Sequence, residues 1–457
     1  SYRMDSIISK FAIVLPTKAR MSLLKKLFLY GLAASIIFLL SCEEESINVT
    51  GEVIEDETDT ENEIDTVTLI EVDTVIFGFA VPEKYLFVRD ADGDGVNDTT
   101  VSFDGQTTRL KMAVELIDVL KDTTASAARL TSMFAHEEGV EDFLDVELNT
   151  SSKQIRNKIG ANTGSTVDTD AVRTDVTTWM TSQVNDVFPN WSTEASSGVA
   201  GKIQEAGGGA NRYVNAYGLE LDQAVSKALI GAFVADQALN GYLTPTKLDG
   251  GTNRADQSSG SVLEGKAYTN MEHYWDEGYG YIYGLAEDGM DPVTTPGSAD
   301  KFLLKYIEKV DSDTDFTGIA SRIFDAFKLG RAALVVGDYT TRDDAAKDIM
   351  AEISKVIAIR AAHYLKAGQE GKAEATPDMA NVFHDLSEGY GFVYSLQFTY
   401  NPETGAPYFT RAEVLSMLDK VYPTSDDQKG FWEVTPEVLE AVATEITTAF
   451  GFTYENA

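Results

Sequence analysis

The sequence predicts a mainly α-helical protein, a duplicated helical bundle preceded by a short β or extended segment that carries an Asp-rich loop. Three observations support this fold class. Apolar residues recur at helical spacing through most of the chain after Gly105. One aromatic-rich motif occurs twice. Aspartates alternate with small residues after Arg89, between two short strand-like stretches.

The composition excludes several classes of function. The 457 residues include 73 Asp and Glu against 37 Lys and Arg, for a net charge of −36. Nucleic acid is therefore not an expected partner, because its phosphates require many basic side chains. The single Cys excludes an internal disulfide framework and a Cys-based zinc cluster. Only four His are present, so any histidine-built site is easy to enumerate.

The N-terminal part resembles an export signal. Residues 1–20 are interpreted as a non-native upstream extension, and residues 21–41 as a lipoprotein signal peptide, in which two lysines precede an apolar run. That run is shorter than the roughly 20 residues of a membrane-spanning helix. Cys42 follows Leu-Leu-Ser, as in a lipobox, and is the predicted site of lipid attachment. The alternative is an ordinary secretory signal with an incidental Cys.

Residues 42–74 form a predicted acidic tether. They are rich in Asp, Glu and Thr and hold neither Lys nor Arg, so charge repulsion and low apolar content predict an extended linker. The acidic cluster directly after Cys42 resembles a surface-export signal. We therefore expect an outer-membrane lipoprotein, exposed to the periplasm or the cell surface and held by its lipid. The helical domain is predicted over residues 75–457, starting with an extended segment at 75–82.

An Asp-rich loop lies between predicted strands at 85–89 and 99–103. Its oxygen donors are spaced as in a calcium-binding loop, with a Gly at the position of the sharp turn. The bidentate Glu that would complete an EF-hand loop is replaced by Val101. The candidate calcium ligands are four carboxylates and one carbonyl: Asp90, Asp92, Asp94, Val96 and Asp98. A metal-free Asp/Gly turn is the alternative.

Helices are predicted wherever the i, i+3/i+4 apolar spacing persists. Thr341 is expected to precede one helix and Gly368 to follow its end. The predicted helices are 109–121, 172–187, 219–242, 268–285, 300–310, 319–335, 342–366, 381–400, 411–421 and 436–450.

The repeated motif is His-x-x-x-Glu-Gly-Tyr-Gly-aromatic-β-branched-Tyr-x-Leu, at 273–285 and 384–396. Residues four apart share a helix face, so packing the two helices together would join four metal ligands: His273, Glu277, His384 and Glu388. Facing helices build metal sites in bundles in this way, and two His with two Glu suit iron or zinc. The alternative is a structural polar network.

The glycines after each Glu of the motif disfavour a helix, so they predict either close helix–helix approach or a helix break. Two segments upstream, at 221–233 and 349–361, are weakly alike around Lys227 and Lys355. The two remaining histidines carry less information. His363 is interpreted as a core residue or a neighbour of the site, and His136 as a surface residue at a helix end.

Five segments carry a resemblance to a known family: GQTTRL (105–110), KALIGAFVADQ (227–237), MEHYWDEGYGY (271–281), LGRAA (329–333) and HDLSEGYGFVYSL (384–396). In these the chain resembles the lipoprotein family numbered 4856 among the domains of unknown function. The resemblance implies an envelope lipoprotein that accompanies imelysin-like proteins and outer-membrane receptors associated with iron uptake. The chain is also remotely similar to imelysin-like helical proteins themselves. It does not keep their Gly-x-His-x-x-Glu pattern, because Met271 stands at the Gly position, and Asp276 and Ser387 stand at the Glu position.

Three functions follow as hypotheses. The first is non-enzymatic binding of a metal or metal complex in envelope iron acquisition, with an outer-membrane receptor or an imelysin-like protein as partner. The second is a surface module for a protein or glycan, in which the His/Glu motifs are structural and nearby aromatic residues line a groove: Tyr274, Trp275, Tyr279 and Tyr390. The third, a metal-dependent hydrolase, is disfavoured because no nucleophile or three-ligand zinc motif is identifiable.

Overall fold

The computed structural model describes residues 78–162, 166–425 and 427–457. The predicted signal peptide, Cys42 and the acidic tether lie outside the described residues. The chain divides into units at 1–80 and 81–457, and the second unit is the helical body. Within the described residues, no helix is both long enough and apolar enough to span a membrane.

The mainly α-helical fold class is confirmed. Two antiparallel two-stranded sheets accompany the helices of the described residues. The α-helices are α2 (Asp104–Val119), α3 (Ala127–Phe134), α4 (Val146–Asn149), α5 (Thr166–Ser182), α6 (Leu221–Leu229), α7 (Pro245–Leu248), α8 (Asn253–Ser259), α9 (Asn270–Tyr283), α10 (Leu303–Asp311), α11 (Ile319–Val336), α12 (Tyr339–Ala373), α13 (Met379–Ser395), α14 (Arg411–Val421) and α15 (Pro436–Phe450). The π-helical segments are η2 (Gln183–Val187), η5 (Ile230–Ala235) and η6 (Ala238–Tyr242), and the 3₁₀ turns are η1 (Arg156–Lys158), η3 (Phe188–Asn190), η4 (Ala206–Gly208), η7 (Leu396–Phe398) and η8 (Gly430–Trp432).

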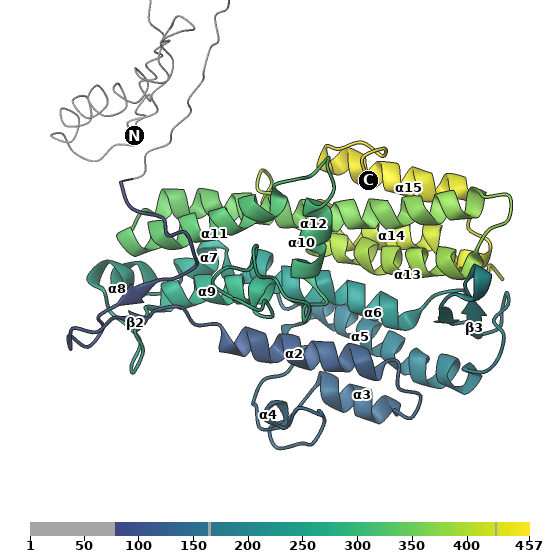
Figure 1. Cartoon of the computed structure of the whole chain (residues 1–457), viewed down its shortest axis with the longest axis horizontal. Helices are drawn as coiled ribbons and strands as arrows, with labels where there is room; N and C mark the ends of the chain where they lie inside the picture. The colour runs from purple at the N-terminus through teal and green to yellow at the C-terminus, as the bar shows by residue number, and fades with distance from the viewer. Residues whose placement is uncertain (1–77, 163–165, 426) are drawn as a thin grey trace, which may run out of the picture. The chain divides into compact units, whose positions relative to one another are not determined.

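The long helices of the second unit lie in tiers (Figure 1). Helix α12 packs against α11, α13 and α15, and α13 packs in turn against α6. Helix α9 contacts α2, α11 and η6, while α3 lies against α2 and α5. The buried apolar side chains of these helices form one continuous core. Figure 1 shows α9 and α13 side-on near opposite ends of the bundle.

Helix α12 differs from its predicted bounds at both ends. Asp338, not Thr341, is its N-cap, because the Asp338 carboxylate accepts the Thr341 N–H at 3.0 Å. Gly368 does not end the helix but lies inside it, where a Cβ would fall 2.6 Å from Cγ of Leu386 on α13. The glycine therefore permits close packing of α12 on α13 instead of forming a C-cap.

A side chain from α13 explains why the helix that begins at Leu221 becomes π-helical. The Ser395 hydroxyl donates to the Lys227 carbonyl at 2.8 Å and accepts the Gly231 N–H at 3.0 Å. It thus stands between the two groups that would bond to each other in a regular α-helix. A side chain inserted into the hydrogen-bond ladder widens it locally, and η5 begins at Ile230.

The two sheets are short. Strands β1 (Val88–Arg89) and β2 (Asp98–Thr99) pair on either side of the Asp-rich loop, as predicted but over fewer residues. No strand forms in the described part of the predicted extended segment, residues 78–82. Strands β3 (Gly201–Gln204) and β4 (Asn211–Val214) form a second hairpin, which was not predicted from the sequence.

A buried ionic network fastens the N-terminal hairpin to the bundle. Arg331 of α11 is fully buried and donates to Asp276 at 3.0 Å and to Glu272 at 3.3 Å, both on α9. Arg89 of β1 binds Glu272 through both of its terminal nitrogens, at 2.7 and 3.0 Å. The Tyr85 hydroxyl donates to Asp276 at 2.7 Å. Charged groups therefore hold together segments that lie far apart in the sequence.

Candidate functional site

The two copies of the repeated motif lie on α9 and α13, and their glycines mark close helix contacts. On α9, a Cβ at Gly280 would fall 2.9 Å from Cγ of Phe103. On α13, a Cβ at Gly391 would fall 2.8 Å from the Ala224 carbonyl oxygen. Neither helix breaks at these positions. Of the two predictions for the motif glycines, close approach is confirmed.

The contacts of these glycines show how the two copies correspond. Each first glycine faces a Tyr-Leu pair on a neighbouring helix, Tyr242-Leu243 for Gly278 and Tyr364-Leu365 for Gly389. Each second glycine faces a polar residue, Gln106 for Gly280 and Lys227 for Gly391. The helix that runs from Leu221 through η6 to Tyr242 therefore serves both copies, because its start packs on α13 and its end packs on α9.

The first copy centres on Glu277. Its carboxylate accepts a 2.8 Å hydrogen bond from the Gln106 side chain and lies beside the Tyr242 hydroxyl. His273 directs Nε2 toward Glu277, 3.9 Å away, while its Nδ1 lies 3.1 Å from the Ser102 carbonyl oxygen. An Nδ1–H donated to that carbonyl leaves the Nε2 lone pair facing the carboxylate.

The second copy centres on Glu388, whose carboxylate is paired with the side chain of a lysine. The Lys227 ammonium lies 3.1 Å from the Glu388 carboxylate, and both side chains are buried. His384 directs Nε2 toward Glu388, 4.0 Å away, and its Nδ1 lies 2.6 Å from Glu220. Arg212 also approaches His384, at 3.1 Å. The second copy is thus an extended network of acids and bases.

The neighbouring charges and burial shift the pKa values of one group in the second copy and of two groups beside the first. Burial alone would raise the pKa of Glu388, but the Lys227 ammonium, the Tyr364 hydroxyl and His384 lower that pKa to about 2. Burial and the nearby Glu277 raise the pKa of Tyr242. Burial, and secondly the charge of Arg109, lower the pKa of Lys158, whose ammonium lies 3.2 Å from the Tyr242 hydroxyl. The Glu388 carboxyl group is therefore ionised at neutral pH.

The structure places the four predicted metal ligands in two separate pairs. Each His faces the Glu of its own helix, and each pair has its own set of partners. Within the described residues, the one cluster of three or more acidic, His or Cys ligand atoms that all lie within 4.8 Å of one another is formed by Asp90, Asp92 and Asp94. The related lysines also differ, since Lys227 binds Glu388 whereas Lys355 lies over the Phe316 ring.

The Asp-rich loop is exposed and internally hydrogen-bonded. Asp90 accepts the N–H groups of Gly93 and Gly95 at 2.8 and 3.1 Å, and both glycines adopt positive φ. Val96 is 62% exposed, and Asp98 lies in β2. These bonds are those of an Asp/Gly turn, while the clustered carboxylates are the donor type that calcium prefers. Both the calcium site and the metal-free turn stay predictions.

The predictions for three residues are wrong. Trp275 and Tyr279 do not line a groove, since both are fully buried and their polar atoms bond the Phe327 and Gly289 carbonyl oxygens. His136 is not a surface residue but is 2% exposed, with Nδ1 2.7 Å from Asp142. His363 is partly buried, and burial together with Arg360 lowers its pKa to about 4.

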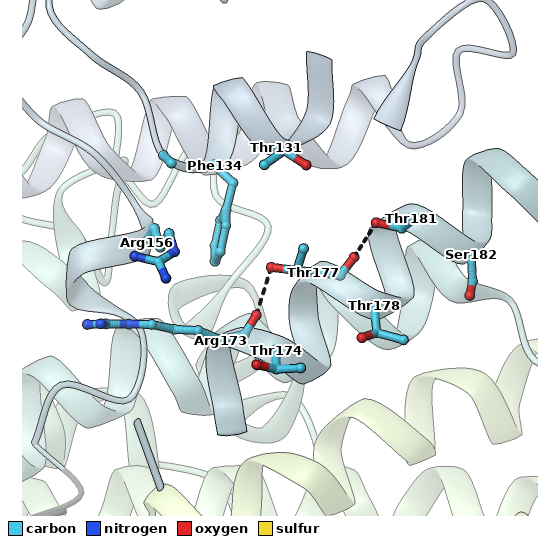
Figure 2. A pocket seen from close by; sticks show the side chains of 10 residues that line it. Thr131, Phe134, Arg156, Arg173, Thr174, Thr177, Thr178, Thr181 and Ser182 are labelled. Atoms are coloured by element: carbon cyan, nitrogen blue, oxygen red, sulfur yellow. Dashed lines mark hydrogen bonds between the residues drawn. The ribbon is translucent and has the colours of Figure 1, made fainter. Parts of the chain in front are cut away.

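Sequence reasoning missed an open groove between α3 and α5, with a volume of about 470 Å³. Figure 2 shows two arginines, Arg156 and Arg173, at one end and a row of hydroxyl-bearing side chains along α5. The signal for this row was present in the sequence, because threonines at positions 174, 177, 178 and 181 share neighbouring faces of one helix.

Comparison with known proteins gives one family. The family model described as a domain of unknown function (DUF4856) matches residues 82–453. No curated protein and no solved structure matches the chain.

Proposed function

Because the chain belongs to this family of domains of unknown function, we propose its role from the geometry: a non-enzymatic, lipid-anchored binding protein of the cell envelope, in which the repeated His/Glu pairs are structural. The observation that carries the proposal is the internal pairing of both motif glutamates. Glu277 accepts from Gln106, and Glu388 is neutralised by Lys227. Polar groups with such partners inside a fold stabilise it without needing a ligand.

The envelope location is supported by the sequence. Lys25 and Lys26 precede a short apolar run, and Cys42 follows where lipid attachment would occur. The net charge of −36 opposes electrostatic attachment to an anionic membrane, so a lipid is the more suitable anchor. The residues after Cys42 would then serve as a spacer that holds the helical body away from the bilayer.

Metabolic labelling with a fatty-acid analogue tests the anchor. In a bacterial host with lipoprotein processing, we expect the full chain to be labelled and to sediment with membranes. Cys42→Ser should abolish the label and release the protein, whereas Ser41→Ala should keep both. Persistence of the label in Cys42→Ser, or no label in the wild type, would overturn the anchor. Protease treatment of intact cells then separates a surface location from a periplasmic one.

A second candidate function, metal binding for iron acquisition, is favoured by one difference between the copies. In the first copy the neutral Gln106 side chain stands where the second copy has the Lys227 ammonium. A cation beside His273 and Glu277 would therefore take the place that a side-chain ammonium already fills in the second copy. His273 also has its Nδ1 held by a backbone carbonyl, as metal-ligating histidines do.

Metal analysis of the untagged full chain tests this candidate. We expect about one iron or zinc per chain in the wild type, a loss of more than half of it in His273→Ala, and little change in His384→Ala. The repeat makes these two variants a matched pair, since each removes an imidazole that faces a Glu one turn away. Wild-type protein without metal, or equal metal in His273→Ala, would exclude a site at His273.

A further inference from the structure

The groove between α3 and α5 is lined by two arginines, Arg156 and Arg173. Arg156 is exposed, and Arg173 is held by its own hydrogen bonds to the carbonyl oxygens of Ile159 and Asn157, at 3.3 and 3.2 Å. Among the residues that the structure describes, no carboxylate lies within 4.0 Å of either guanidinium. Burial and the charge of Arg156 lower the pKa of Arg173, an effect that Asp170 opposes.

Two neighbouring arginines that form no ion pair with a described carboxylate are unexpected in so acidic a chain. Asp and Glu outnumber Lys and Arg by about two to one, and several arginines of the chain bind carboxylates, as Arg411 binds Asp175 at 2.6 Å. Two guanidiniums near one another repel unless an anion lies between or beside them. A carboxylate suits such a pair because it can accept several N–H bonds at once.

The hydroxyl groups of the groove supply the complementary chemistry. Thr177 donates its hydroxyl proton to the Arg173 carbonyl oxygen at 2.8 Å, and Thr181 donates its own to the Thr177 carbonyl oxygen at the same distance. Across the groove, Thr131 donates to Ala127 at 2.8 Å. With its proton engaged on the helix, each of these oxygens keeps a lone pair that can accept a bond from a ligand. Figure 2 shows Thr131 on α3 above Thr177 and Thr181 on α5.

We propose that this groove binds a hydroxylated carboxylate, namely the acidic sugar residue of a glycan or the corresponding free sugar acid. The carboxylate would lie on Arg156 and Arg173 at one end of the groove. The sugar hydroxyls would donate to the threonine oxygens along α5. The methyl groups of the same threonines would contact the carbon skeleton of the sugar. This site rests on the proposed function, because it gives the binding module a ligand class.

Ligand-observed NMR titration of the full chain tests the site, with galacturonate as probe and galactose as its neutral counterpart. We expect saturable binding of galacturonate with a Kd of about 1 mM, as for other small ligands, and at least tenfold weaker binding of galactose. Arg156→Gln should weaken galacturonate at least tenfold, whereas Arg322→Gln, which changes an exposed arginine of α11, should not.

A hydroxyl-specific variant separates a sugar-acid site from a general anion site. Thr177→Val should weaken galacturonate about threefold or more and leave acetate binding unchanged. Tighter binding of a galacturonate oligosaccharide than of the monosaccharide would indicate a glycan, and equal binding would indicate the free acid. Three results would overturn the site: no saturation by galacturonate, equal affinity for galactose, or an unchanged affinity in Arg156→Gln. The anchor proposal would survive each of them, since fatty-acid labelling of Cys42 does not depend on the groove.

Discussion

Replacing Arg331 with methionine is expected to lower the free energy of unfolding by about 3–5 kcal/mol, the usual effect of removing one partner from a buried ion pair. The Arg331 side chain is fully buried and contacts Asp276, Glu272 and the Thr100 hydroxyl, the last at 3.1 Å. Methionine fills much of the volume but leaves Asp276 without its main counter-charge. Loss of the Arg331 side chain also removes the hydrogen bond that joins α11 to Thr100, next to the N-terminal hairpin.

Urea unfolding of the full chain, followed by circular dichroism, measures this loss. Arg322→Met is the matched control, because Arg322 lies on the same helix but is exposed and pairs with Glu352 at 2.7 Å. An exposed pair contributes at most about 1 kcal/mol, so the control should stay near the wild type. Equal midpoints for the two variants would show that the buried network contributes nothing beyond a surface pair.

Replacing Lys227 with methionine is the second substitution with a large expected effect, a loss of about 3 kcal/mol at pH 7. The Lys227 ammonium is the cation that neutralises the buried Glu388 carboxylate. Lys227→Gln should cost less, because it reproduces the pairing of Gln106 with Glu277 in the first copy. If Lys227→Gln were as unstable as Lys227→Met, an amide would not be an adequate partner in this repeat.

The same variants have a predicted pH dependence. The pKa of Glu388 is about 2 in the folded protein, below the ordinary value of a Glu. A lowered folded-state pKa contributes stability that is present above the unfolded pKa and is lost as the pH falls through the folded one. Lys227→Met raises the Glu388 pKa, so the difference from the wild type should shrink between pH 7 and pH 4. A difference that is constant over this range would contradict the assignment.

The long helices could be predicted from the sequence because their apolar faces repeat over many turns. The predicted range 411–421 coincides with α14, and 436–450 coincides with α15. The end of α12 could not be predicted in this way. Gly368 is a common stop signal, but here Leu386 of another helix occupies the space beside it, and such a contact is not visible in a local pattern.

The His and Glu residues of the candidate site could be predicted from the sequence, but the residues that bind the two glutamates could not. The repeat placed His273 near Glu277 and His384 near Glu388 on two helices, but it also predicted that all four would join in one metal site, and the described residues hold them as two separate pairs. The partners of the glutamates, Gln106 and Lys227, come from elements distant in sequence. The weak likeness around Lys227 and Lys355 did not reveal this role, because Lys355 lies over the Phe316 ring and binds no motif glutamate. His136 was misjudged for a similar reason, since its buried position depends on Asp142 and the loop that follows α3.

The helix from Leu221 to Tyr242 couples the stability of the two repeats, because it packs against both. Its first turns complete the packing of α13 and its last turns complete that of α9, so the unfolding of either repeat strips a buried surface from the other. Such coupling favours a single cooperative transition over two successive ones. We therefore expect the two repeats to unfold together, and a chain cut between them to yield fragments that each lack a packing partner.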